Sequence, residues 1–455
     1  MMFPRRSTTL LFVVTDMVSL ALCFNLVGWA YGIVDADHPL FISLQAPLLV
    51  QAICLYLIDG YNPRTDMLSV TYASLHVIAL GGALIFTFLL TYVFLPPGFT
   101  LQTSRFVITV SYLAVIPVTL LYRRAYFLRL GQRHQQRYFV FLGSPENCLT
   151  FKEECRSHEM QQAVLFATHE TFMRQAAPHG HTAGFGNIVE YLDEYEGKID
   201  AIILRESSHE LPAAVTQKLV DLQFVGVPTY TLELFHQVYW RKIPLYRLNQ
   251  TWLFQEGFPI AREPVFLRLK RLWDIGFALV GLVLFAPFFP LVALAIRLDS
   301  KGPIFFHQQR VGRNRKPFHA IKLRTMRPDS ENALYTKERD ERITRIGRLL
   351  RNSRIDEIPQ LWNVLRGDMS LIGPRAEWVK LVDDYEKKIP CYHFRHLVKP
   401  GITGWAQVSY PYGASLEDTL RKLEYDLYYI RYFSFVLDAS IVLKTVQVMI
   451  FGKGR

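Results

Sequence analysis

The segment Thr344 to Glu377 concentrates the residues that could do chemistry. Its sequence, TRIGRLLRNSRIDEIPQLWNVLRGDMSLIGPRAE, places one carboxylate pair, Asp356-Glu357, among basic side chains. These are Arg345, Arg348, Arg351, Arg354, Arg366 and Arg375. One carboxylate of such a pair can attack phosphorus while its neighbour holds a divalent cation that neutralises phosphate charge. The residue types therefore predict phosphoryl transfer.

Pro359 indicates how this pair is positioned. Proline is favoured in the first turn of a helix, so we expect the pair at a helix N-terminus, where free amides and the helix dipole favour anions. Among arginines, Asp356 should stay ionised and nucleophilic at neutral pH. The dipeptide alone is not specific, because Asp193-Glu194 and Asp340-Glu341 occur without comparable surroundings. Any single arginine is equally well explained as part of a basic face that contacts solvent or lipid headgroups.

Four apolar stretches precede this segment, near residues 10–34, 40–59, 70–95 and 104–122. Each approaches the roughly 20 residues that a helix needs to cross a bilayer. The basic residues around them are Arg5, Arg6, Arg64, Arg123, Arg124, Arg129 and Arg133, whereas Asp35 and Asp37 lie in another connection. The positive-inside rule then predicts a four-helix transmembrane region over residues 1–130 with both ends in the cytoplasm. The basic start, without a small-residue cleavage site, indicates a retained anchor.

A fifth apolar segment, Leu272 to Leu298, has the wrong flanking charge for a crossing helix. Basic residues lie on both sides of it: Arg268, Lys270, Arg271, Arg297, Lys301 and Arg310. Pro287 and Pro290 lie near its middle, where proline removes a backbone donor and kinks a helix. We predict a re-entrant membrane hairpin near residues 272–298. The alternative is a kinked fifth span, which would place the basic C-terminal third outside the cell.

Between these parts, residues 137–260 are expected to form a Rossmann-like cytosolic domain and a linker. The runs YFVFLGSP and DAIILRE are short and apolar, and polar, helix-like stretches separate them. Gly143-Ser144-Pro145 follows the first run in place of GxGxxG, which favours a structural or regulatory domain over a working dinucleotide site. Further on, LEDTLRKLEYDLYYI predicts an amphipathic helix, and FVLDASIVLKTVQVMIF an interfacial or domain-packed one.

Composition narrows the class of partner. The chain of 455 residues is 50% hydrophobic and 20% charged, with a net charge of +11. That charge suits nucleic acid, anionic lipid or phosphorylated substrates, and the apolar segments favour the last two. The five cysteines show no CxxC pairing and no histidine at zinc-finger spacing, so neither a disulfide framework nor a zinc site is indicated.

Three separated motifs carry a family resemblance: FHAIKLRTM, RIDEIPQLWNVLRGDMSLIGPRAE and KPGITGWAQV. In this order, over about residues 262–455, the chain resembles the bacterial sugar transferase domain of polyprenyl-phosphate glycosyl-1-phosphate transferases. The whole arrangement is similar to the large monotopic phosphoglycosyl transferases, which are linked to undecaprenyl phosphate. WLFQEGF and YPYGASLEDTLRKLEYDLYYI look most like the exopolysaccharide subgroup associated with exosortase systems.

The resemblance implies a ping-pong reaction on the cytoplasmic face of the bacterial inner membrane. Asp356 would take the sugar-phosphate from a UDP-sugar and release UMP, Glu357 would help to hold Mg²⁺, and undecaprenyl phosphate would then attack the aspartyl-phosphosugar. The candidate substrate- or phosphate-binding residues are Lys322, Arg324, Arg354, Arg375, Gln407 and Asp438. Ala376 stands where the family has the second proline of GPRP, which puts the backbone shape of that loop in question.

The resulting expectation is a membrane α plus α/β protein: four transmembrane helices, the Rossmann-like domain, and a C-terminal catalytic domain over residues 262–455 with the re-entrant hairpin and amphipathic interfacial helices. Expected partners are the UDP-sugar, undecaprenyl phosphate and membrane lipid, with a homodimer left open and no nucleic acid. A non-enzymatic scaffold that binds anionic lipid is an alternative, but it gives no reason for the DEIPQLWNVLRGDMS constellation. A membrane-bound nucleotide-sugar dehydratase would need a glycine-rich loop and a Tyr-xxx-Lys pair, which the sequence lacks.

Overall fold

The chain divides into two compact units, Met1–Arg241 and Lys242–Arg455, and each is described by itself. The computed structural model describes residues 5–33, 42–62, 65–94, 105–134, 137–158, 160, 162–168, 186–187, 192–195, 197–205, 211–245, 264–327, 340, 342–411, 413 and 415–451. The loop charges Asp35, Asp37 and Arg64 and the WLFQEGF segment lie outside these residues.

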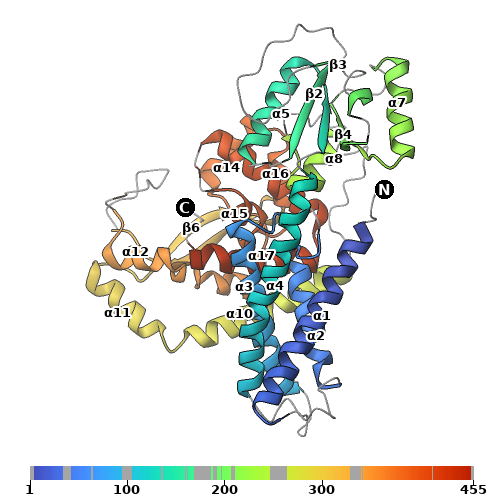
Figure 1. Cartoon of the computed structure of the whole chain (residues 1–455). Coiled ribbons are helices and arrows are strands. Elements are labelled where there is room, and N and C mark those ends of the chain that lie inside the picture. The colour runs from blue at the N-terminus through green and yellow to red at the C-terminus, as the bar shows by residue number, and fades with distance from the viewer. Residues whose placement is uncertain are drawn as a thin grey trace. The chain divides into compact units, whose positions relative to one another are not determined.

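Apolar helices form the N-terminal part of the first unit (Figure 1). They are α1 (Arg5–Ala30), α2 (Gln45–Leu57), α3 (Val70–Leu89), which a π-helical turn (Leu90–Phe94) extends, and α4 (Arg105–His134). Three stretches are long and apolar enough to cross a membrane: Thr8–Ala30, Val70–Phe94 and Arg105–Arg129. The 13 residues of α2 rise about 20 Å at 1.5 Å per residue, which is shorter than the roughly 30 Å hydrocarbon core.

A buried ion pair joins α1 to α4. Asp16 and Arg123 approach to 2.6 Å, with 2% and 0% of their side chains exposed, and the Tyr122 hydroxyl also donates to Asp16. The sequence predicts Arg123 as one of the basic residues that flank the fourth span on its cytoplasmic side. That interpretation is wrong for this residue, because its guanidinium is buried against an acidic partner inside the bundle. Paired charges of this kind are the form in which a helix bundle tolerates ionisable groups.

The first unit also contains a five-stranded parallel sheet. Its strands are β1 (Tyr138–Leu142), β2 (Ala163–Thr168), β3 (Gly186–Asn187), β4 (Ile199–Leu204) and β5 (Thr229–Thr231). They lie in the order β3-β2-β1-β4-β5, and every pairing is parallel. Helices α5 (Pro145–Ser157) and α7 (Ala213–Phe224) lie between strands, and α8 (Leu232–Phe235) follows β5. The strand order reverses beside β1, as in doubly wound sheets.

The second unit combines helices with two small sheets. Its helices are α10 (Pro264–Phe285), α11 (Phe289–Asp299), α12 (Arg345–Asn352), α13 (Gln360–Arg366), α14 (Val379–Lys388), α15 (Trp405–Ser409), α16 (Leu416–Tyr432) and α17 (Phe435–Phe451). Strand β6 (Phe305–Val311) pairs antiparallel with β7 (Pro317–Leu323), and β8 (Ser370–Ile372) pairs parallel with β9 (Gly401–Thr403).

Helices α10 and α11 form one bent pair, with an angle of 66° between them at residues 286–288. Both outer ends of the pair are hydrogen-bonded to other segments of the second unit. Near the start of α10, Arg271 donates hydrogen bonds to the carbonyls of Val364 and Leu365. At the end of α11, the Asp299 carboxylate accepts from the backbone N–H of Ile346 at 2.8 Å. The bend at residues 286–288 confirms the predicted kink near Pro287.

The amphipathic helix predicted near the C-terminus is α16. It begins with a capping box in which Ser415 and Asp418 each accept a backbone N–H of the other. Leu423, Leu427 and Ile430 point into the core of the second unit, as their three- and four-residue spacing predicts. α17 buries one face and leaves apolar side chains exposed on the other, so it packs on the domain as expected.

Candidate active site

Asp356 and Glu357 lie in η8 (Ile355–Glu357), a short 3-10 turn between α12 and α13. Pro359 is the N-cap of α13, so the prediction that it occupies the first helical turn is wrong by one position. Arg354, which precedes the turn, has φ +57°, a left-handed conformation that costs a residue with a side chain roughly 1–2 kcal/mol. This strained residue reverses the chain after α12 and turns both carboxylates inward, where each is 7% exposed.

Glu357 is surrounded by three of the predicted basic residues. Lys322, on β7, approaches its Oε1 to 2.6 Å, and Arg375, beyond β8, approaches the same oxygen to 3.6 Å. Arg354 lies 3.5 Å from Oε2. Burial by itself would raise the pKa of Glu357, but these cations hold that pKa well below its usual range. Glu357 is therefore a permanently ionised group.

Lys322 experiences the opposite balance. Burial lowers the pKa of its ammonium to about 8, and Glu357 only partly offsets this effect, while Arg310 and Arg375 lower the pKa further. The lysine is thus a cation whose charge can be lost within an ordinary pH range.

Asp356 has no hydrogen-bond partner among the described residues, and its Oδ1 is fully buried. Burial and the negative charge of Glu357 raise the pKa of Asp356, against the lowering effect of Lys322, Arg351 and Arg354. The arginines lower the pKa of Asp356 as expected, but burial and Glu357 outweigh them, and ionisation of Asp356 at neutral pH stays a prediction. A carboxylate with a raised pKa and an unoccupied oxygen is the more basic member of the pair and the better nucleophile.

Three other predicted residues lie outside this cluster of cations. Arg324 donates to the carbonyls of Ser300 and Ile296, at 2.5 and 3.4 Å, and so caps the end of α11. Asp438 accepts from Lys270 and from the Tyr429 hydroxyl, at 2.5 and 2.8 Å, and so joins α17 to α10. Their contacts in the described residues hold elements together, and their predicted role in substrate binding stays a prediction.

Gln407 belongs to α15, next to the glycine-rich loop. Its Nε2 donates to the Ile402 carbonyl at 2.9 Å, whereas its Oε1 is buried without a hydrogen-bond partner. The loop itself needs glycine, because a Cβ added at Gly401 or Gly404 would collide with the backbone of Gly373. This close approach brings the third motif against the GPRA segment.

Arg310 also lies at the site, although the sequence predicts it only as one of the charges that flank the hairpin. Its Nη1 donates to the carbonyl of Ala376 at 2.5 Å, while Nε and Nη2 both donate to the Gln308 side-chain oxygen. Burial, and to a lesser degree Arg375, lowers its pKa to about 10. The GPRA loop, with alanine in place of proline, is thus held by Arg310 and by the Gly401 N–H bond to Pro374, 2.9 Å long. Arg310 lies on β6, outside the three motifs, so the sequence did not indicate that it belongs to the site.

Within the described part of the chain, no group of three or more His, Cys, Asp or Glu side chains could hold a metal ion. Asp356 and Glu357 remain as two adjacent carboxylates. Mg²⁺ is commonly bound through one or two carboxylates, with substrate phosphates and water completing its shell. The donor set at η8 therefore fits a magnesium ion that is bound together with a phosphorylated substrate.

Known proteins are similar to this chain, and the match to a protein family lies in its C-terminal part. The family model described as bacterial sugar transferase matches residues 265–452. A UDP-glucose:undecaprenyl-phosphate glucose-1-phosphate transferase of Caulobacter vibrioides is 44% identical over 202 residues, which are 44% of this chain and 75% of the relative. The exopolysaccharide production protein PSS of Rhizobium leguminosarum bv. phaseoli is 43% identical over 188 residues, or 40% of this chain and 94% of the relative. The chain belongs to the bacterial sugar transferase family.

A further bacterial relative extends the similarity beyond the family segment. It is a UDP-N-acetylgalactosamine-undecaprenyl-phosphate N-acetylgalactosaminephosphotransferase of Aeromonas hydrophila, 36% identical over 276 residues. The match covers 60% of this chain and 64% of the relative. All candidate site residues of this sugar transferase, from Lys322 to Asp438, lie inside the segment that the family model matches.

Proposed function

We propose that this protein transfers a sugar-1-phosphate from a UDP-sugar to undecaprenyl phosphate and releases UMP, through a covalent aspartyl-phosphosugar. The observation that carries the proposal is Asp356, a buried carboxylate with a raised pKa and no hydrogen-bond partner among the described residues, beside a cluster of cations. The relatives' names support both substrates. The product would start an exopolysaccharide repeat unit, in keeping with the name of the Rhizobium relative.

The two chemical steps are displacements at one phosphorus atom. In the first, an oxygen of Asp356 forms a bond to the sugar-bearing phosphorus, and the bond to the UMP oxygen breaks. In the second, an oxygen of undecaprenyl phosphate attacks the same phosphorus and returns the electron pair to Asp356. Lys322, Arg354 and Arg375 present positive charge to the phosphate oxygens throughout, which stabilises the charge that develops during transfer.

We propose that Glu357 helps to hold Mg²⁺ when substrate is bound. The ion would neutralise phosphate charge and so favour both displacements. Glu357 suits this role because its pKa is held low, so its carboxylate stays ionised at any working pH. Its Oε2, which faces the exposed Arg354 at 3.5 Å, is the less tightly paired of its two oxygens.

We also propose a membrane arrangement for the whole chain. Because one compact unit binds both outer ends of the α10–α11 pair, the pair enters and leaves the bilayer on one side, as a re-entrant hairpin. This side is the cytoplasmic face of the bacterial inner membrane, where UDP-sugars are available and where basic loops collect. The remaining apolar stretches form four spans, and the parallel sheet forms a Rossmann-like cytosolic domain.

The reaction is tested in isolated membranes supplied with labelled UDP-sugars and undecaprenyl phosphate. We expect UMP and a lipid diphosphate-sugar from the wild type, and neither product from Asp356→Asn or after removal of magnesium. Asp383→Asn, on an exposed carboxylate of α14, is the matched control and should remain active. Full activity of Asp356→Asn would reject this nucleophile, and inactivity of the wild type with every donor would favour the lipid-binding scaffold.

A further inference from the structure

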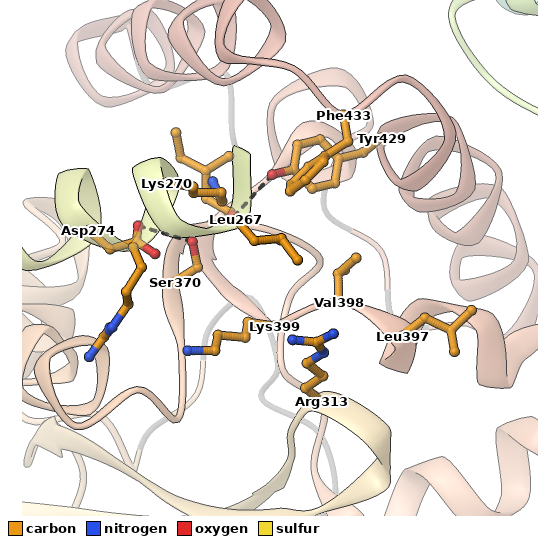
Figure 2. A pocket seen from close by; sticks show the side chains of 12 residues that line it. Leu267, Lys270, Asp274, Arg313, Ser370, Leu397, Val398, Lys399, Tyr429 and Phe433 are labelled. Atoms are coloured by element: carbon orange, nitrogen blue, oxygen red, sulfur yellow. Dashed lines mark hydrogen bonds between the residues drawn. The ribbon is translucent and has the colours of Figure 1, made fainter. Parts of the chain in front are cut away.

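A second site in the same unit does not involve the carboxylate pair. A cavity of about 140 Å³ lies beside the first turns of α10, next to β8 and to the residues that precede β9. Figure 2 shows Lys270 and Asp274, from α10, on one side of it, and Arg313 and Lys399 on the other. None of the residues that contact Glu357 lines this cavity.

The charged groups on the α10 side already have partners in the protein. Lys270 is paired with Asp438 at 2.5 Å. The Asp274 carboxylate accepts hydrogen bonds from the Ser370 hydroxyl and from the backbone N–H of Leu371, both at 3.0 Å. These contacts fix α10 against β8 and occupy Oδ1 of Asp274. The Asp274 charge acts on Lys399 across the cavity, but within the described residues it forms no ion pair with the cations on that side.

The cations opposite have no acidic partner. Neither Arg313 nor Lys399 makes an ion pair or a side-chain hydrogen bond in the described part of the chain. Arg271 lies beside them, and its guanidinium donates only to backbone carbonyls. Burial lowers the pKa of Lys399, and the neighbouring charges of Arg271 and Arg313 lower it further, although Asp274 and Asp368 act against them. Three neighbouring cations that repel one another favour a bound anion.

The remaining lining is apolar and continues toward the hairpin. Leu267 and Phe433 border the cavity, and beyond them α10 exposes Leu272 and Trp273, at 66% and 57%. A free nucleotide has no alkyl chain to bury against this apolar border. An amphiphile can place its phosphate among the cations and its alkyl chain along the exposed apolar side chains of α10. Basic pockets beside membrane helices bind anionic headgroups in this way.

We propose that this cavity binds a lipid-borne phosphate, with Arg313 and Lys399 as its direct ligands, Arg271 as an additional charge, and the alkyl chain against Leu267 and Phe433. The ligand is either an anionic phospholipid or a polyprenyl phosphate, which share this chemistry. The inference rests on the proposed location of α10 in the membrane. It requires no step of the sugar-phosphate transfer.

Binding is measured on the full chain by native mass spectrometry, as the number of lipids retained during titration. The probes are phosphatidylglycerol, undecaprenyl phosphate and, as the zwitterionic reference, phosphatidylcholine. The anionic probe that fits the cavity should fill one saturable site there, which for undecaprenyl phosphate is additional to the acceptor site at Asp356. The affinity of the cavity site should fall at least tenfold in Arg313→Gln/Lys399→Gln, because two charge-assisted contacts are removed. Lys399→Arg should retain binding, as should Lys387→Gln, an exposed lysine of α14 without an ion pair.

The outcomes distinguish a phospholipid from a polyprenyl phosphate as the ligand, and they test this site separately from the transfer reaction. A site that phosphatidylglycerol saturates and the double variant loses is a phospholipid site. A site that undecaprenyl phosphate alone saturates and the double variant loses is an acceptor-docking site. Equal binding of phosphatidylcholine, or unchanged binding in the double variant, would overturn the inference. Asp356→Asn should bind lipid as the wild type does, so failure of the transfer reaction cannot be mistaken for failure of this site. If thermal unfolding shows that the double variant is misfolded, Arg313→Gln, on an exposed side chain, provides the same test.

Discussion

At the residue scale, burial and ion pairing act in opposite directions on two adjacent carboxylates. Glu357 faces three cations, and its pKa is held low in spite of burial. Asp356 accepts no hydrogen bond from the described residues, and burial and Glu357 raise its pKa. Two neighbouring acids thereby acquire different roles, a basic nucleophile and a fixed negative charge, as expected when the environment separates the pKa values of a pair.

The first prediction concerns the pH dependence of UMP release. Activity should rise as pH increases through the pKa of Asp356, because the nucleophile must be ionised. It should fall again near pH 8, where Lys322, whose pKa is lowered to about 8, loses its charge. Lys322→Arg should move this alkaline limb to higher pH, since a guanidinium stays protonated. The measurement is kcat/KM against pH for both proteins, and an alkaline limb that does not move would show that Lys322 is not responsible.

The sequence predicted the cluster of cations better than the individual contacts. Lys322 belongs to one motif and Arg354 and Arg375 to the two ends of another, and all three meet at Glu357. Charge pattern alone could not show that Arg324 caps α11 instead, because backbone carbonyls leave no trace in a sequence. Arg310 was missed for the same reason, since its partner is the carbonyl of Ala376.

At the element scale, the close approach of β8 and β9 depends on glycine. Gly401→Ala should destabilise the protein by roughly 2–4 kcal/mol, because the new Cβ collides with the backbone of Gly373 and neither backbone can move away cheaply. Gly276→Ala is the matched control. Its Cβ would meet nothing within 4 Å in α10, and alanine favours a helix by up to about 1 kcal/mol. Thermal unfolding of both variants checks this, and equal stability would contradict the packing described.

A second prediction at this scale concerns the bent pair α10–α11. Single cysteines introduced as Arg268→Cys and Lys301→Cys, in a background without the five native cysteines, should both be protected from a membrane-impermeant maleimide added outside intact cells. Both should react after the membrane is opened. Thr100→Cys, between α3 and α4 and expected outside, should be labelled in intact cells. Labelling of Lys301→Cys from outside would favour the kinked fifth span.

The hydropathy pattern predicted this pair more completely than it predicted the sheet. Pro287 indicates a bend, and the break at residues 286–288 agrees with it. That both ends lie on one side of the membrane, as the flanking charges predict, stays a prediction. The order β3-β2-β1-β4-β5 was not predicted, because strand order depends on contacts between residues far apart in the chain. The length of α2 was overestimated, since apolar loop residues extend an apolar run beyond its helix.

At the scale of the whole molecule, the candidate chemistry resides in one unit. The candidate site residues lie within Lys242–Arg455, and the match to the Rhizobium relative covers 94% of that protein with only 40% of this chain. We therefore predict that residues 242–455, expressed alone in membranes, release UMP within about tenfold of the full chain's rate, since a compact unit with its own core folds alone. A fragment that folds, as judged by circular dichroism, but is inactive would show that the first unit contributes to the site.

The most direct test of the account is the covalent intermediate itself. Purified enzyme is mixed with UDP-sugar and Mg²⁺ in the absence of undecaprenyl phosphate, quenched, digested and analysed by mass spectrometry. We predict a peptide that contains Asp356 with the added mass of the sugar phosphate, formed with stoichiometric UMP and discharged when undecaprenyl phosphate is added. UMP released in step with lipid-linked product, with Asp356 never modified, would contradict the covalent mechanism.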